Sequence, residues 1–136
     1  MSENSIESQG IGALKAIFIG QIIVNLVYGV NNLIMPELSL EMAQDPTGSN
    51  PGYFRWSGGT LLGLAAGQIM VLRNVVGQGP MVTLAAVGNT LVCLALLYSW
   101  ATEYQGVTWF IATPVVITFV FAVLFWWAKY KYRDIL

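Results

Sequence analysis

The sequence predicts an all-α fold, an antiparallel bundle of four helices that crosses a membrane as a single domain over residues 1–136. Apolar residues make up 56% of the chain and charged residues 10%, whereas an ordinary soluble domain carries about 25% charged residues. Four stretches are long and apolar enough to cross a bilayer, which takes about 20 residues of helix. The segment 60–72 also lacks the polar stripe that a helix of a soluble bundle shows.

The four predicted spans are residues 11–35, 55–73, 80–100 and 108–128. The second and third connections are short, so we expect successive helices to be antiparallel neighbours. The first connection, the outer loop 36–54, is the long one. It starts with a proline, which suits a first helical turn, and we expect a short helix over its first nine residues. The remainder is rich in turn-forming residues and is expected to be irregular.

The distribution of Lys and Arg predicts the orientation of the spans. Four crossings place both termini and the second connection on one side of the membrane, together with five of the six basic residues, while the other side has only Arg55. Basic residues collect on the cytoplasmic side of membrane proteins, so both termini are expected to be cytoplasmic. The five basic residues on that side are Lys15, Arg73, Lys129, Lys131 and Arg133.

Polar residues inside the spans are the candidate ligand-binding residues. Four of them recur in the first span at spacings of four, three and four residues, which places them on one helix face. Polar groups are costly against lipid, so this face is expected to point into protein. Two interpretations stay open, namely hydrogen bonds that hold helices together or the lining of a small pocket. The candidates are Gln21, Asn25, Tyr28 and Asn32 in the first span, Gln68 in the second and Asn89 in the third.

A glycine repeat in the second span indicates close helix packing. Gly59, Gly63 and Gly67 recur every four residues, and glycines at this spacing allow another helix to approach closely in a membrane. Gln68 projects from the side of the helix opposite Gly59. We therefore expect the glycine face to pack against another helix of the same chain or against a second protein.

The composition excludes several classes of function. The chain has no histidine, which removes the usual haem ligand, the commonest zinc ligand and the commonest general base. No phosphate-binding loop or nucleophile motif is present, so no catalytic residue, metal or cofactor is predicted. A net charge of −1 gives no footprint for nucleic acid, and the lack of a carboxylate inside the spans argues against a proton-coupled transporter.

Two segments carry a family resemblance. Residues 28–36 read YGVNNLIMP and residues 54–67 read FRWSGGTLLGLAAG. A glycine several residues before a proline, a variable outer loop and then Arg-x-x-Gly-Gly with further glycines resembles the DoxX-like superfamily of small four-helix bacterial membrane proteins. The resemblance implies an inner-membrane bundle. Some members are linked to quinone oxidation or to partner enzymes, but no redox residue here matches theirs, so that activity is not carried over.

The same resemblance singles out Arg55, at the outer start of the second span. The resemblance implies that Arg55 binds a lipid headgroup, an anionic ligand or a carboxylate of the outer loop such as Glu37. The alternative is an ordinary arginine at the membrane interface, where a long basic side chain reaches the headgroups.

Three hypotheses about function follow. The first is a non-catalytic accessory or scaffolding subunit that contacts the lipid bilayer and docks on a larger membrane complex or on copies of itself. The second is a protein that binds or acts on a lipophilic small molecule such as a quinone, and it predicts a cavity that reaches Gln21, Asn25, Gln68 or Asn89. The third, a channel or transporter, is the weakest, because four spans without a detectable repeat are few for a transporter that works alone.

Overall fold

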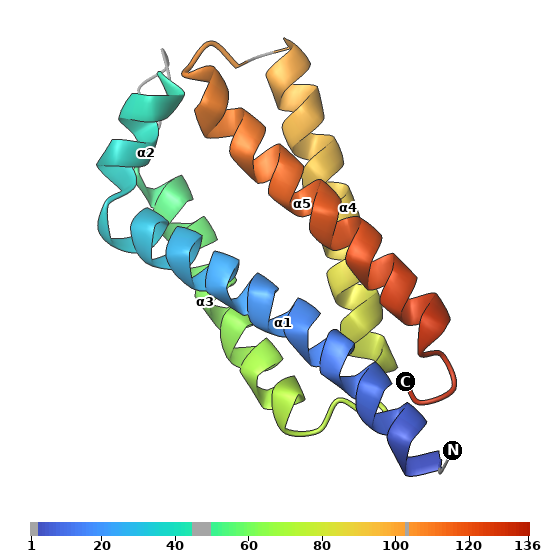
Figure 1. The fold of residues 1–136 in the computed structure, drawn as a ribbon. Coiled ribbons are helices and arrows are strands. Elements are labelled where there is room, and N and C mark those ends of the chain that lie inside the picture. The colour runs from blue at the N-terminus through green and yellow to red at the C-terminus, as the bar shows by residue number, and fades with distance from the viewer. Residues whose placement is uncertain (1–2, 45–49, 103) are drawn as a thin grey trace.

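The computed structural model describes residues 3–44, 50–102 and 104–136, and within them the regular structure is entirely helical (Figure 1). The all-α expectation is therefore confirmed. Each predicted span coincides with a long helix, and the first helix extends well before its predicted span. The described helices are α1 (Glu3–Ile34), α2 (Pro36–Ala43), α3 (Gly52–Arg73), α4 (Gly79–Thr102) and α5 (Thr108–Lys131).

Three of these helices are long and apolar enough to cross a membrane. They are α1 over Ile11–Ile34, α4 over Gly79–Thr102 and α5 over Thr108–Lys131. The second predicted span forms α3, which is not one of the three. Glycine, serine, threonine, glutamine and arginine residues lower the mean hydropathy of α3, although it is 22 residues long and a helix of that length is about 33 Å from end to end.

The long helices form two hairpins. α1 packs along α3, α4 packs along α5, and α1 also touches α5. Successive long helices run in opposite directions, so both chain termini lie at the same end of the molecule (Figure 1). We call this the proximal end, and the opposite end, where α2 lies, the distal end.

An apolar core joins the two hairpins at the proximal end. Its centre is the contact between Phe18 of α1 and Phe125 of α5, whose ring centroids are 5.1 Å apart in an edge-to-face arrangement. Leu14, Val75 and Val82 are buried beside them. One backbone N–H of the α3–α4 connection and one at the start of α4 donate to carbonyls of the C-terminal residues, at 2.9 Å and 3.1 Å respectively. Burial of this apolar cluster stabilises the proximal end.

The short helix α2 joins the hairpins at the distal end. The backbone carbonyl of Met42 accepts hydrogen bonds from the Val107 N–H at 3.1 Å and from the Tyr104 hydroxyl at 3.3 Å. Burial raises the pKa of the Tyr104 hydroxyl above its ordinary value, so this group stays protonated and able to donate. The predicted short helix of the outer loop is thus present, and residues 45–49 of that loop lie outside the described residues.

Candidate functional site

A cavity of about 260 Å³ lies between the two hairpins, midway between the proximal core and the distal end. α1, α3, α4 and α5 all line it, mostly with aliphatic side chains. An apolar cavity of about 150 Å³ accommodates benzene, so this one has room for a substituted ring. Five of the predicted ligand-binding residues line it, namely Gln21, Asn25, Tyr28, Gln68 and Asn89.

Three buried amides form a hydrogen-bonded chain on one wall of the cavity. Asn25 Nδ2 donates to Gln68 Oε1 at 3.1 Å, and Gln68 Nε2 donates to Gln21 Oε1 at 3.2 Å. The three side chains are 8%, 4% and 3% exposed for Gln21, Asn25 and Gln68. These hydrogen-bonded amides join α1 to α3 and also line the cavity. The same residues therefore hold two helices together and form the wall of a pocket, which are the two interpretations of the polar face.

Asn89 lies on the opposite wall, on α4. It is 7% exposed, and its Nδ2 donates to the Ala85 carbonyl of its own helix at 2.8 Å. The neighbouring Thr90 bonds within the second hairpin, where it donates to Ala86 O and accepts from Trp126 Nε1 at 3.1 Å. The polar residues therefore form two separate walls, one on each hairpin, and a molecule in the cavity would touch both.

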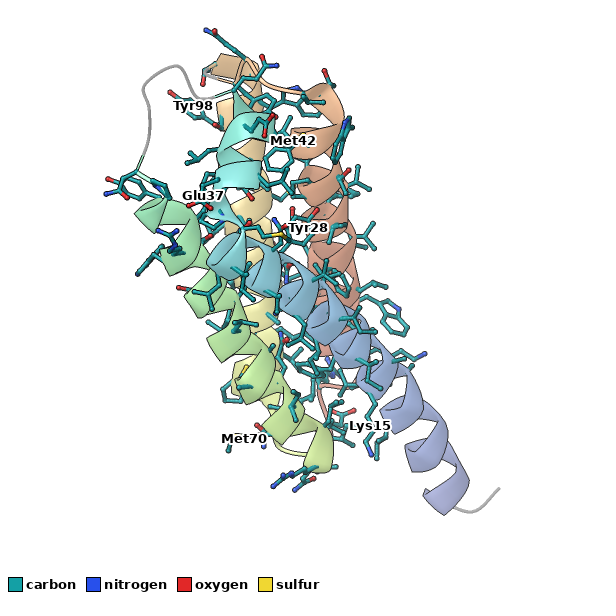
Figure 2. The ribbon with its side chains drawn as sticks, turned by 90° about the vertical axis from the view of Figure 1, so that its left-hand side faces the viewer. Lys15, Tyr28, Glu37, Met42, Met70 and Tyr98 are labelled. Atoms are coloured by element: carbon teal, nitrogen blue, oxygen red, sulfur yellow. The ribbon has the colours of Figure 1, made fainter. Side chains whose placement is uncertain are left out.

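Tyr28 marks the distal limit of the cavity. It also lines a second cavity of about 230 Å³ beneath α2, which is bounded by side chains of α1, α2 and α5. Figure 2 shows Tyr28 between Met42 at the distal end and Lys15 and Met70 at the proximal end. Tyr28 therefore separates a central cavity from a distal one.

Asn32 does not line the central cavity, although it shares a helix face with the residues that do. Its Nδ2 donates to Ser57 Oγ of α3 at 3.2 Å, and its Oδ1 accepts from Ser39 Oγ of α2 at 3.0 Å. Ser39 is fully buried. Asn32 thus ties α1, α2 and α3 together at the distal end.

Arg55 also lies outside the cavity. Its Nη2 is 2.9 Å from Glu37 Oε1, which links the start of α3 to α2. The two side chains are 50% and 64% exposed, so the ion pair is at the surface. Of the partners that the resemblance implied for Arg55, the loop carboxylate is the one in contact.

The predicted glycine face is open within the part of the chain that the structure describes. A Cβ added at Gly59 or Gly63 would meet no neighbouring atom within 4 Å, and one at Gly67 would meet only Met81 Cε at 3.6 Å. The close approach of α1 and α3 is made by Gly58 instead, where an added Cβ would lie 2.7 Å from the Gly29 carbonyl oxygen. The sequence analysis did not assign this role to Gly58. The signal for it was that Gly29 and Gly58 lie in the two segments, 28–36 and 54–67, that carry the family resemblance.

The candidate residues therefore fall into three groups. Five line the central cavity, Asn32 and Arg55 hold the distal end together, and the repeat of glycines faces outward. Comparison with protein-family models, with curated proteins and with solved structures gave no match to this chain.

Proposed function

We propose that this protein binds a neutral lipophilic small molecule, such as a quinone, in the cavity between its two hairpins. The observation that carries the proposal is the chain of buried amides Gln21, Gln68 and Asn25 on the wall of a cavity that is otherwise largely aliphatic. Ligand sites commonly combine an apolar lining with a few convergent polar groups that fix orientation. Asn89 on the facing wall supplies a further polar group.

The chemistry of the lining selects a neutral ligand. The described lining residues include no Asp, Glu, Lys or Arg, so a charged molecule would lose its hydration without an ionic partner. Amide side chains offer both N–H donors and carbonyl acceptors. A carbonyl or hydroxyl group on the ligand would therefore find a complementary partner on either wall.

We also propose that the chain crosses a bilayer four times, with the cavity inside the bilayer and both termini in the cytoplasm.

 The proposal has three supports. α1, α4 and α5 are each apolar and long enough to cross a membrane. α1 and α4 run in the same direction (Figure 1), so the chain returns through α3 between them. Large apolar side chains cover the outer surface, among them Met70 at 70% exposed and Phe119 at 59% exposed.

The orientation and the membrane rest on two further supports. Basic residues, which favour the cytoplasmic side, gather at the proximal end, where Arg73, Lys129 and Lys131 end their helices. The resemblance to the DoxX-like superfamily favours a bacterial inner membrane. Membership of that superfamily stays a proposal, carried by the motif around Gly29 and Gly58.

The test is photolabelling of the protein in lipid nanodiscs with an alkyl benzoquinone that carries a diazirine on its ring. We expect labelled peptides from α1 between Gln21 and Tyr28 and from α4 around Asn89. Excess unlabelled decyl-benzoquinone should remove this labelling. Labelling that is spread over the lipid-facing surface and resists competition would overturn the proposal.

Two variants and one control sharpen this experiment. Gln68→Leu removes the centre of the amide chain, and Asn89→Leu removes the facing amide, which donates a hydrogen bond within its own helix. Both are expected to reduce the labelling that excess decyl-benzoquinone removes. Thr60→Val is the control, because Thr60 is exposed and bonds only to the carbonyl of Trp56 on its own helix. Unchanged labelling in both leucine variants would contradict a site at the amides.

A second candidate function is that of an accessory subunit, as a partner of other membrane proteins or of copies of itself. The observation that favours it is the open space beside Gly59 and Gly63 on α3, a surface that another helix can approach closely. Native mass spectrometry after extraction in mild detergent tests it. A partner at fixed stoichiometry that is lost in Gly63→Leu supports the candidate, and a lone monomer contradicts it.

A further inference from the structure

We propose that the central cavity opens sideways into the bilayer between α3 and α4, so that its ligand enters from the lipid and leaves a hydrocarbon tail there. This inference rests on the proposed function and adds to it the route of entry and the class of ligand. The ligand is an amphiphile with a neutral, ring-sized head and an apolar tail.

The exposure of the lining residues locates the opening. Leu64 of α3 and Leu84 and Val92 of α4 line the cavity and are nevertheless 40%, 54% and 49% exposed. Every lining residue contributed by α1 and α5 is buried or half-buried. The exposed rim therefore belongs to α3 and α4 alone.

Packing closes the proximal end of the cavity and the part of its side where α1 contacts α5. The core around Phe18 and Phe125 fills the proximal end. On the side of α1 and α5, a Cβ added at Gly20 would lie 3.3 Å from the Phe121 ring. α2 joins the two hairpins at the distal end through Met42. α3 and α4, by contrast, are not among the pairs of helices that pack extensively.

Gly88 widens the opening at its middle. It lies between Leu84 and Val92 at spacings of four residues, so all three share one face of α4. Gly88 lines the cavity, and a Cβ added there would meet no neighbouring atom within 4 Å. The opening therefore consists of an apolar rim around a gap that no side chain fills.

The size of the cavity determines which part of the ligand stays outside it. With about 260 Å³, against about 150 Å³ for a cavity that accommodates benzene, it holds one substituted ring and not a long alkyl chain as well. The polar groups lie at the buried amides, and the rim at Leu64, Leu84 and Val92 is apolar. A polar head at the amides thus leaves its tail at the rim, in contact with lipid.

The test uses two photoreactive alkyl benzoquinones that differ only in the position of the diazirine, on the ring or at the middle of the tail. The ring probe is expected to label the segments around Asn25 and Asn89. The tail probe is expected to label α3 near Leu64 and α4 near Leu84. Tail labelling on α1 and α5 instead would overturn lateral entry between α3 and α4. Failure of the ring probe to give competable labelling would count against the proposed function itself, so the two failures are distinguishable.

A plug in the opening provides an independent test. Gly88→Leu places a side chain in the gap, and Gly12→Leu on α1 is the matched control because a Cβ there also meets no neighbour and Gly12 does not line the cavity. Detergent-solubilised protein is mixed with micelles that carry the ring probe and is irradiated after set delays. The initial labelling rate is expected to fall about tenfold in Gly88→Leu, which corresponds to a barrier raised by about 1.4 kcal/mol. An unchanged rate in Gly88→Leu would overturn the proposed route.

Discussion

Gly58 of α3 lies against Gly29 of α1 so closely that a Cβ at Gly58 would be 2.7 Å from the Gly29 carbonyl oxygen. A second backbone atom, the Leu33 nitrogen, would be equally near. Backbone atoms cannot move aside as the end of a flexible side chain can. This contact therefore fixes the distance between α1 and α3, and with it the position of the amide chain that the same two helices carry.

The first prediction concerns this contact. Gly58→Ala is expected to destabilise the protein by about 1–3 kcal/mol, the range for overpacking, even though alanine is intrinsically favoured over glycine in a helix by about 1 kcal/mol. Gly59→Ala is the matched control, since its Cβ meets open space, and it is expected to be neutral or stabilising. Thermal unfolding in detergent, followed by circular dichroism, measures both. Equal midpoints in the two variants would contradict the close approach.

The second prediction concerns the amide chain. Gln68→Leu removes both hydrogen bonds and leaves Gln21 and Asn25 buried without their partner. Interhelical hydrogen bonds in membranes average about 0.6 kcal/mol, and a buried polar group without a partner costs about 1–3 kcal/mol. The loss is therefore expected to exceed that of the two bonds alone.

A double-mutant cycle separates these contributions. Adding Gln21→Leu to the Gln68→Leu variant removes one of the groups left without a partner, so the double variant is expected to recover part of the lost stability. Unfolding midpoints in one detergent give the comparison. Additive losses from the two substitutions would show that Gln21 and Gln68 do not interact.

The third prediction concerns the ion pair between Arg55 and Glu37. Exposed ion pairs contribute up to about 1 kcal/mol, so Arg55→Met and Glu37→Gln are each expected to destabilise only slightly, and less at high salt. The two substitutions together are expected to cost no more than either one alone. If Arg55 instead served an external anion, Arg55→Met would have a salt-dependent effect that Glu37→Gln lacks. Unfolding at two ionic strengths distinguishes these outcomes.

The spacing of polar residues predicted which side chains of α1 face the protein, but not what each one meets. Gln21 and Asn32 share a face and are eleven residues apart, which is about 16 Å along a helix. At that distance they lie at different depths, so Gln21 reaches the cavity while Asn32 bonds to Ser39 and Ser57. Periodicity specifies direction around a helix, whereas depth depends on where the neighbouring helices start and end.

The cavity itself was expected only as a consequence of one hypothesis about function. It exists because α3 and α4 do not close against each other, and no local pattern in either helix specifies that gap. The glycine repeat shows the same limit. Gly58 and Gly59 differ by one position, or about 100° around the helix, yet only Gly58 contacts α1. The spacing of the glycines predicted close helix packing, whereas the register of α1 against α3 determines which glycine makes the contact.

The last prediction concerns the distal connection between the hairpins. Tyr104→Phe removes the hydroxyl that donates to the carbonyls of Met42 and Val107, at 3.3 Å and 2.9 Å. Because that end then opens more often, the Val107 amide, which donates to Met42, is expected to exchange its hydrogen faster. The Gly77 amide at the proximal end should keep its protection. Hydrogen exchange measured by mass spectrometry gives both.

Tyr98→Phe is the control for this measurement, because Tyr98 is 65% exposed and the same change in chemistry there leaves the distal connection intact. Its exchange pattern is expected to match that of the unmodified protein. Faster exchange at both ends in Tyr104→Phe would mean that the molecule opens as one unit, and unchanged exchange at Val107 would mean that the hydroxyl does not hold the hairpins together. Faster exchange confined to the distal end would identify α2 as the part of the fold that opens first above the cavity.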